Sequence, residues 1–234
     1  MYRERWSDRA GAIVWTRTIT PHGATHRILP DGCLDLIWID GQLVVAGPDT
    51  EARLEVSRVG ARYVGLRFPP GIGPTVLGVP ADELRDHTVP LDAVWPGDSV
   101  RRLTEQIADA PDQVDAVESV AAERLRETPP PDPAVQAIAG LLRAGRAVAA
   151  TAEAVGLSER QLHRRCLTAF GYGPKTLARV LRLDRAVALA RAGTPFATVA
   201  ASAGYADQAH LAREVKSLAG VPLGVLTGRA VLTG

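Results

Sequence analysis

Two stretches of the chain present arginine, glutamine and histidine side chains after what reads as the same turn. The first is GLSERQLHRRCLTAFG, residues 156–171, and the second is GYADQAHLAREVKSLAG, residues 204–220. Arginine can form two hydrogen bonds with a guanine edge and glutamine can do so with adenine, so these side chains on a helix could read bases in a major groove. The base-reading candidates are Arg160, Arg164, Gln208 and Arg213.

Other polar residues of the two stretches are further candidates for DNA binding. Ser158 and Asp207 can each cap the helix that follows, because their side-chain oxygens suit the free N–H groups of a first helical turn. Gln161 belongs to the same polar face as Arg160. His163 and His210 can contact bases or phosphates, and a solvent-facing histidine without a partner is an equally good interpretation.

The charged residues between and beside the two stretches are not expected to read bases. Lys175, Arg179, Arg182 and Arg185 belong to the connecting helix, where long cationic side chains suit phosphates or acidic partners better than bases, and Lys175 and Arg179 are the two taken as DNA-binding candidates. Arg165 and Glu214 can instead form a solvated or salt-bridged flank. Arg165 and Glu214 are therefore left out of the DNA-binding set.

A repeated helix-turn-helix is the element that would position these side chains. Ala152 precedes Gly156 by four residues, and Ala200 precedes Gly204 by four. The small alanine lets two helices cross closely, and the glycine supplies the left-handed backbone of a tight corner. Plain helix packing is the alternative, but two matched copies in a basic region favour DNA binding.

The recognition helices are predicted over 158–170 and 207–218, and one helix over 174–191 joins them. A helix of that length is about 27 Å long at about 1.5 Å per residue. It could therefore hold two recognition helices near one DNA turn apart, roughly 34 Å. The resulting hypothesis is that one chain reads two successive major grooves on one face of DNA.

Charge is unevenly distributed along the 234 residues, although the net charge is only +1. Residues 1–131 hold 14 Arg, no Lys and 20 acidic residues, and residues 132–234 hold 11 Arg, 2 Lys and 6 acidic residues. An acidic half joined to a basic half indicates that one part binds a polyanion, with chance composition of two solvated surfaces as the alternative. The Pro-rich stretch TPPPDP lies at the change of sign. The predicted domains are 1–127, a Pro-rich linker at 128–133, and 134–234.

The first half reads as short strands separated by Gly, Pro and Asp, which is typical of a small barrel or sandwich. Asp40-Gly41 predicts a tight hairpin turn. Two helices follow, and the second carries an apolar stripe between 114 and 125 that can pack on the barrel or on a second copy of the protein. Everything after the linker reads helical, so the predicted fold class is α+β. The predicted strands are 12–19, 33–39, 42–47, 53–59 and 62–68, and the two helices are 98–109 and 112–127.

An effector pocket in the strand-rich half is a second hypothesis. Asp35 interrupts the apolar run CLDLIWI and would need a hydrogen-bonding partner if it is buried. An ordinary place in the core is the simpler interpretation for each candidate. The candidates for lining the pocket are Trp15, Asp35, Trp38 and Arg67.

The sequence carries no recognisable catalytic motif or phosphate-binding loop, so no enzyme and no cofactor are predicted. His22, His26 and Asp35 make a weak metal set, because PHGATH lacks the His-x-His of a metal-binding cupin, and we predict no metal. Cys33 reads better as a small buried hydrophobe than as a regulatory thiol. Cys166 is too distant in the sequence for CxxC chemistry with it.

The last hundred residues resemble the DNA-binding domain of the AraC/XylS family of bacterial transcription regulators. GYADQAHLAREVK is similar to the family pattern Gly-Phe/Tyr-x-Asp-Gln-Ser-x-Phe-x-Arg-x-Phe-Lys. Leu211, Val215 and Cys166 stand where aromatic residues are usual, which keeps these positions apolar. The first half resembles an uncharacterised domain type fused to such helical domains. The resemblance implies a cupin-like barrel, a helical pair for dimerisation and a DNA-reading domain.

The residues and the resemblance together predict a sequence-specific DNA-binding transcription regulator controlled by a small effector or by dimerisation. Expected partners are operator DNA, a second copy of the chain in a homodimer, a small-molecule effector and RNA polymerase. The charged opening lacks a secretory signal and no apolar run approaches the ~18 residues of a membrane span, so we expect no membrane contact and a cytoplasmic location. Two alternatives are a DNA-acting alkyl-transfer repair protein using Cys33, and a regulator whose first half only mediates assembly.

Overall fold

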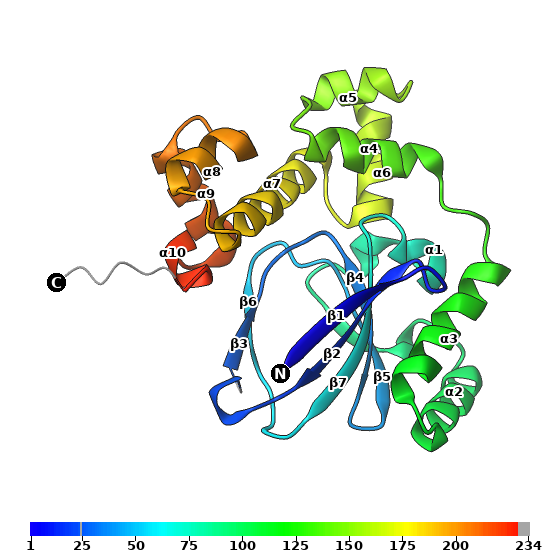
Figure 1. Cartoon of the computed structure of the whole chain (residues 1–234). Coiled ribbons are helices and arrows are strands. Elements are labelled where there is room, and N and C mark those ends of the chain that lie inside the picture. Colours follow the sequence, from blue (N-terminus) through cyan, green and yellow to red (C-terminus); the bar gives the residue numbers. More distant parts are fainter. Residues whose placement is uncertain (24, 229–234) are drawn as a thin grey trace.

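The computed structural model describes residues 1–23 and 25–228, which form a strand-rich first half and an all-helical second half (Figure 1). This arrangement confirms the predicted α+β class. The strands are β1 (Tyr2–Ser7), β2 (Ala12–Thr18), β3 (Thr25–Ile28), β4 (Leu34–Ile39), β5 (Gln42–Ala46), β6 (Arg53–Val56), β7 (Arg62–Phe68) and β8 (Thr88–Pro90).

Six strands form one antiparallel sheet in the order β1-β2-β7-β4-β5-β8, and β3 pairs with β6 in a separate antiparallel ribbon. The hairpin between β4 and β5 turns at Asp40 and Gly41, whose φ angles are 47° and 78°. Positive φ at both central residues is what a tight hairpin turn requires, and this explains the Asp-Gly pair.

The large sheet is covered on both faces, and its strands alternate between them. Leu34, Leu36 and Trp38 of β4 are buried in the core that the sheet shares with the helices of the first half. Asp35 and Ile37 lie on the opposite face, which turns toward the β3–β6 ribbon. Because side chains alternate along a strand, the apolar ones pack against the helices, and the face toward the β3–β6 ribbon carries a mixture of polar and aromatic side chains.

Helices close the outer face of the large sheet. The helical segments of the first half are η1 (Pro21–Gly23), α1 (Gly73–Leu77), η2 (Ala81–Glu83), η3 (Leu91–Ala93), α2 (Gly97–Asp109) and α3 (Gln113–Glu127). The apolar stripe of α3 (Val114, Val117, Ala121 and Leu125) packs into the core of this sheet. The first of the two predicted alternatives is therefore the one observed, and this stripe supplies no surface for a second copy.

Several short elements were not predicted from the sequence. β1 has the sequence YRERWS and exposes five of its six residues, because it is an edge strand of the sheet. β3 is polar, and β8 has three residues and ends in Pro90. None of these segments shows the apolar run or alternation on which a strand prediction depends. In addition, β3 pairs with β6 and β8 pairs with β5, which are not their neighbours along the chain.

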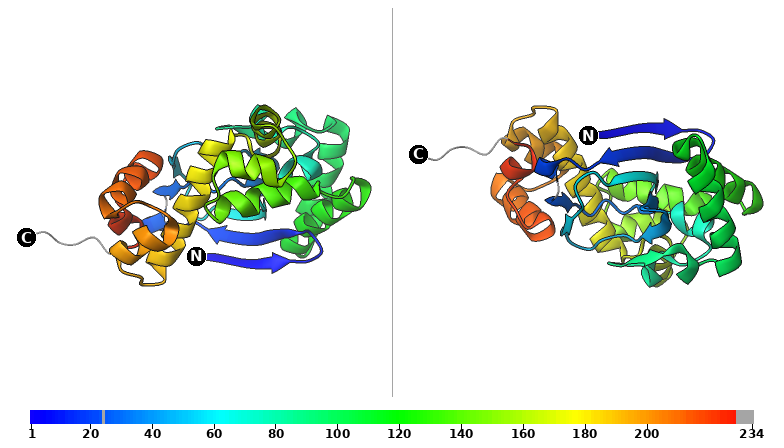
Figure 2. Two further views of the ribbon diagram at one scale, coloured as in Figure 1. Left: turned by 90° about the horizontal axis from the view of Figure 1, so that it is seen from above. Right: turned by 90° about the horizontal axis from the view of Figure 1, so that it is seen from below.

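The second half contains seven helices among the described residues: α4 (Pro133–Arg143), α5 (Val148–Ala154), α6 (Glu159–Phe170), α7 (Pro174–Arg191), α8 (Phe196–Ala203), α9 (Gln208–Ala219) and α10 (Leu223–Leu226). The long helix α7 joins a group made of α4, α5 and α6 to a group made of α8, α9 and α10 (Figures 1 and 2). Each group has its own core, with Leu162 and Cys166 in the first and Leu211 and Val215 in the second. None of the described helices is long and apolar enough to cross a membrane.

The Pro-rich segment connects α3, which ends at Glu127, to α4, which begins at Pro133. Asp132 caps α4, because its Oδ1 accepts a hydrogen bond of 2.9 Å from the Ala134 backbone N–H. Proline at the first helical position costs no hydrogen bond there. We keep the borders 1–127 and 134–234 as the proposed domain limits.

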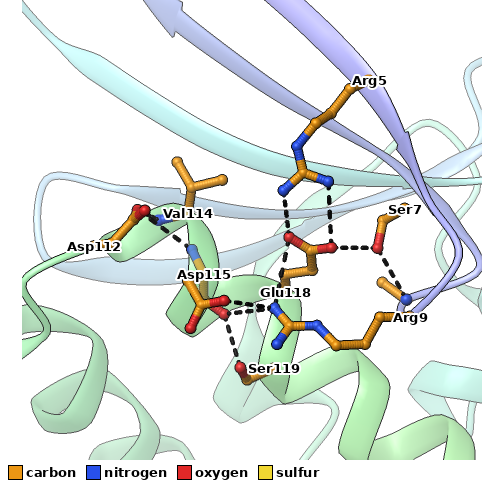
Figure 3. A network of polar contacts seen from close by, with 9 residues as sticks. Arg5, Ser7, Arg9, Asp112, Val114, Asp115, Glu118 and Ser119 are labelled. Carbon is orange, nitrogen blue, oxygen red and sulfur yellow. Dashed lines mark hydrogen bonds and ion pairs between the residues drawn. The ribbon is translucent and has the colours of Figure 1, made fainter.

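A buried carboxylate fastens the edge strand β1 to α3 (Figure 3). Arg5 Nη2 and Nη1 lie 2.6 Å and 3.3 Å from the two carboxylate oxygens of Glu118, and the Ser7 hydroxyl donates to the same carboxylate. Arg9 Nη2 lies 3.6 Å from Glu118 and 2.9 Å from Asp115. Burial alone would raise the pKa of Glu118, but the hydrogen bonds from Arg5 and Ser7 and the nearby arginine charges together lower it.

We expect Glu118→Gln to lower the free energy of unfolding by about 1–2 kcal/mol at neutral pH, since it removes charge-assisted hydrogen bonds whose arginine partners are partly exposed. A depressed carboxyl pKa stabilises the fold above the unfolded-state pKa, and this contribution is lost as the pH falls through the folded-state value. Urea unfolding at pH 7 should therefore separate the two proteins, and the gap should shrink in acid. Glu123→Gln, on an exposed position of the same helix, is the control. An equal gap at both pH values would contradict this account of Glu118.

Candidate nucleic-acid interface and effector cavity

The first helix-turn-helix consists of α5 and α6 and turns at Gly156, whose φ of 68° is left-handed. Ser158 and Gln161 form a capping box at the start of α6. The Ser158 N–H and hydroxyl each donate to Gln161 Oε1 over 2.9 Å, and the Gln161 N–H donates to Ser158 Oγ over 3.3 Å. The side-chain oxygens of both residues thus stabilise the start of the helix, and the Gln161 amide nitrogen takes no part in the capping box.

Arg160 and Arg164 lie one turn apart on the outer side of α6, and both are exposed. Within the described part of the chain, neither guanidinium makes an ion pair. His163 is also exposed, and its ring lies against the backbone after α6, where a Cβ at Gly173 would come within 2.7 Å of the ring. Arg165 is held by Asp132 at 2.8 Å, as expected for a salt-bridged flank.

The second helix-turn-helix consists of α8 and α9 and repeats this geometry at Gly204, with φ of 82°. Asp207 caps α9 by accepting a 2.6 Å hydrogen bond from the His210 backbone N–H. The His210 ring faces back toward the turn, where Nδ1 accepts a 3.2 Å hydrogen bond from the Ala206 N–H. His210 is therefore engaged in the turn, whereas Gln208 and Arg213 are exposed.

Two arginines of α7 are engaged within the chain. Arg179 Nε lies 2.9 Å from Glu214 Oε1, and Arg182 Nη2 lies 3.4 Å from Glu214 Oε2. These pairs attach α9 to α7, and they agree with the salt-bridged interpretation of Glu214. Lys175 is exposed at the start of α7 and remains the better candidate for a phosphate contact.

The interior of the first half contains a cavity of about 110 Å³ between the large sheet and the β3–β6 ribbon. Three of the four predicted pocket residues meet there: Trp15 from β2, Asp35 from β4 and Arg67 from β7. Trp38 does not line it and is 4% exposed in the core beneath the helices. Trp38 is three residues from Asp35 on one strand, and strand alternation places it on the other face. The pocket hypothesis is corrected accordingly.

Asp35 has the hydrogen-bonding partners that its burial demands. Trp15 Nε1 donates to Asp35 Oδ1 over 2.6 Å, and Arg67 Nε lies 3.4 Å from Asp35 Oδ2. The same Arg67 nitrogen lies 3.3 Å from Asp31 Oδ2, so the Asp31 carboxylate also faces the cavity. Burial raises the pKa of Asp35, although the charge of Arg67 and the hydrogen bond from Trp15 oppose the shift.

Gly65 makes the contact between Trp15 and Asp35 feasible. It lies on β7 between β2 and β4, and it is the cross-strand neighbour of both Trp15 and Ile37. A Cβ at this position would lie 2.2 Å from Cε2 of the Trp15 ring. The indole therefore crosses β7 above a glycine to reach Asp35. A glycine inside the strand RYVGLRF was the sequence signal for such a close approach.

The strand-rich half also contains the weak metal set of the sequence analysis and the Cys33 thiol. Among residues 1–23 and 25–228, no three His, Cys, Asp or Glu side chains are grouped to hold a metal ion. Burial, with the charges of Asp31 and Asp35, raises the pKa of the Cys33 thiol. A raised pKa disfavours the thiolate that an alkyl-transfer reaction needs.

The strand-rich half contacts the residues that directly follow the C-terminal end of α6. The Tyr172 hydroxyl donates to the Asp49 carbonyl over 2.8 Å in a buried position, and Arg85 Nη1 donates to the Gly171 carbonyl over 3.2 Å. Gly171 caps α6 with φ of 77° and packs against Pro48, where a Cβ would lie 2.5 Å away. A cation beside the last carbonyls of a helix is favourable.

The same half holds the C-terminal end of α9. The Ala52 N–H donates to the Leu218 carbonyl over 2.7 Å, and Arg27 Nη1 donates to the Ala219 carbonyl over 2.9 Å. Asp49 and Ala52 both belong to the loop between β5 and β6, residues 47–52, which thereby contacts the ends of both recognition helices. Gly47 and Asp49 of this loop also line the cavity. Sequence patterns did not reveal these contacts, which join residues more than a hundred positions apart.

Comparison with known proteins identifies the two halves. Residues 151–229 match the family described as Helix-turn-helix domain, and residues 12–90 match the family described as Domain of unknown function (DUF6597). No curated protein sequence matches the chain.

Solved structures with a similar fold include ToxT of Vibrio cholerae. An apo variant of ToxT is 11% identical over 97% of this chain and 99% of that one, with a TM-score of 0.54. ToxT with a bound unsaturated fatty acid is 13% identical over 92% and 95%, with a TM-score of 0.50. A transcriptional regulator of Chromobacterium violaceum with an AraC-type DNA-binding domain is 20% identical over 44% and 96%, with a TM-score of 0.39.

The family match places a helix-turn-helix domain, a type of domain that binds DNA, in residues 151–229. The comparison with ToxT shows that the whole chain has a similar fold. The recognition made from GYADQAHLAREVK is confirmed, and so is the resemblance of the strand-rich half to an uncharacterised domain type. The chain joins a domain of unknown function in residues 12–90 to a C-terminal helix-turn-helix domain of the AraC type.

Proposed function

We propose that this chain is a cytoplasmic, sequence-specific transcription regulator that reads two successive major grooves with α6 and α9. The exposed residues Arg160, Arg164, Gln208 and Arg213 make the base contacts. Lys175, His163 and the amide of Gln161 meet phosphates or base edges nearby. Ser158, Asp207 and His210 act by shaping the two turns, and Arg179 acts by attaching α9 to α7 through Glu214.

We propose further that the strand-rich half controls DNA reading through a small effector in the cavity. One observation carries this proposal: the loop 47–52 lines the cavity and also contacts the chain beyond α6 and the end of α9. A ligand that moves this loop would alter the distance or angle between the two recognition helices. Such a ligand shifts the equilibrium only by its differential affinity for the two arrangements.

The alternative of a first half that only mediates assembly has less support, because the apolar stripe of α3, which belongs to the helical pair expected to mediate dimerisation, is buried within the chain. A homodimer and a contact with RNA polymerase stay predictions. The alkyl-transfer alternative has less support as well, because Cys33 is poorly suited to form a thiolate.

DNA sites with base pairs inserted between the segments contacted by α6 and by α9 test whether the strand-rich half sets the spacing of these two helices. We expect the affinity of the wild type to fall steeply with one inserted base pair. Arg27→Ala combined with Tyr172→Phe should tolerate the insertion better, because it removes the hydrogen bonds to the Ala219 and Asp49 carbonyls. Electrophoretic mobility shifts over the spacing series measure the effect.

Arg3→Ala, at an exposed position of β1, should keep the spacing profile of the wild type and serves as the control. If the double variant and the wild type show the same spacing profile, the strand-rich half does not set the spacing of the helices. If neither protein prefers any spacing, the proposed reading of two grooves fails.

A further inference from the structure

We propose that the cavity binds a small organic monocation, an amine or quaternary ammonium group on a compact apolar body. This inference rests on the proposed effector control and names the class of ligand. It follows from the balance of charges around the cavity and from the rings that line it.

The first charged group of the cavity has one arginine between two carboxylates. Arg67 Nε lies 3.3 Å from Asp31 and 3.4 Å from Asp35. The single guanidinium charge is shared by two carboxylates, so one negative charge remains uncompensated when both are ionised. Asp35 lies deeper, with its side chain 13% exposed against 32% for Asp31. Both carboxylates line the cavity, so this residual negative charge faces it.

The second charged group repeats this composition on the β6 side. Arg53 Nε lies 3.2 Å from Asp49, and Arg53 Nη1 lies 3.0 Å from Glu55. One guanidinium again serves two carboxylates, and all three side chains line the cavity. Asp49 also belongs to the loop 47–52, which places this charge next to the contact with Tyr172.

Arg17 and His26 complete the set of ionisable side chains that line the cavity besides its tyrosines and Cys33. Arg17 has no ion-pair partner within the described residues and offsets one negative charge. Burial, together with the charge of Arg17, lowers the pKa of His26, which disfavours a positive charge on its ring. Burial also raises the pKa of Asp35 and of Asp49. When all four carboxylates are ionised they face three arginines, and the resulting net charge of −1 fits one positive charge better than two.

Aromatic rings supply the surface against which such a cation would pack. Trp15 and Tyr63 are each 8% exposed and line the cavity, and Tyr2 lies against Trp15 with 6.3 Å between ring centres. The faces of such rings attract ammonium groups. A carboxylate ligand would meet the residual negative charge instead, so the unsaturated fatty acid found in ToxT is not the class we expect here.

Three probes of similar size test the inference: cyclopentylamine, cyclopentanol and cyclopentanecarboxylate, each titrated calorimetrically into the full chain. We expect the amine to bind at least about tenfold more tightly than the alcohol, as one charge-assisted hydrogen bond provides. The carboxylate should bind more weakly than both. Tightest binding by the carboxylate, equal binding by all three, or no binding by any of them would overturn the inference.

Variants with opposite expected effects sharpen the test. Glu55→Gln keeps the Arg53–Asp49 pair and should weaken amine binding about threefold to tenfold, whereas Arg17→Ala should strengthen it by a similar factor. Glu51→Gln, an exposed carboxylate of the loop 47–52, is the control. Unfolding curves identify any variant that does not fold. Effects of the same sign in Glu55→Gln and Arg17→Ala would overturn the inference.

The spacing series on DNA separates this inference from the function on which it depends. If the titrations contradict amine binding but Arg27→Ala with Tyr172→Phe makes DNA binding more tolerant of inserted base pairs, only the ligand class is rejected. If the titrations contradict amine binding and the double variant shows the same dependence on DNA spacing as the wild type, both the ligand class and the effector control are rejected.

Discussion

Replacing Arg160 and Arg213 together by alanine should weaken binding to the preferred DNA site by about 2–6 kcal/mol. Each arginine that reads a base is worth about 1–3 kcal/mol, and the two residues lie on different helices, where separate effects add. Both side chains are exposed on the recognition helices, and no intramolecular ion pair within the described residues competes with DNA for either. Most of the loss should be in sequence preference, because phosphate contacts remain.

Fluorescence anisotropy with the preferred site and with scrambled DNA, over a series of salt concentrations, measures this effect. Lys175→Ala is the matched comparison. A lost phosphate contact should weaken binding to both DNAs equally, and it should reduce the slope of log affinity against log salt concentration by about one. A double variant that loses affinity equally for both DNAs would show that neither arginine reads bases.

Gly65→Ala should lower the free energy of unfolding by about 3 kcal/mol. A Cβ at this position would lie 2.2 Å from the Trp15 ring, so the indole must move from its buried position. Overpacking of this kind costs about 1–3 kcal/mol, and the lost hydrogen bond to the Asp35 carboxylate adds about 1.5–3 kcal/mol if it is not replaced. The expected loss lies below the sum of these contributions, since the ring can relax partly.

Urea unfolding followed by tryptophan fluorescence measures the change directly. Gly140→Ala on α4 is the control: the new Cβ would meet no other described atom within 4 Å beyond its own helical surroundings, so the substitution should be neutral or stabilise the helix. Trp15→Phe should lose the hydrogen bond and keep much of the packing. Adding Gly65→Ala to the Trp15→Phe variant should therefore lower the free energy of unfolding less than adding it to the wild type. Equal stability of Gly65→Ala and the wild type would contradict the described contact of Trp15 with Asp35.

Local patterns predicted most of the helical half. Glycine at the turns, capping residues at Ser158 and Asp207, and apolar residues four apart gave α6 and α9 within one or two residues. These features act between neighbours in the sequence, so they can be recognised without knowledge of the fold. The β4–β5 hairpin was predictable for the same reason, because its turn depends on Asp40 and Gly41 alone.

The missing parts of the prediction depend on strand pairing that the residue types do not reveal, or on contacts between residues distant in the sequence. β1 and β3 are polar, and only pairing with β2 and β6 defines them as strands. Residue type alone suggests Trp38 for the pocket, although its position relative to Asp35 already places it on the other face. The cavity carboxylates Asp49 and Glu55, and the contact between Asp49 and Tyr172, required the fold to bring them together.

The central claim is that one chain reads two successive major grooves, one with each recognition helix. Missing-base interference on the preferred DNA site tests it most directly, with the wild type, Arg160→Ala and Arg213→Ala compared side by side. We expect two clusters of interfering bases about 10–10.5 base pairs apart on one face of the DNA. Arg160→Ala should erase one cluster and Arg213→Ala the other. A single cluster, or the loss of the same cluster in both variants, would contradict the claim.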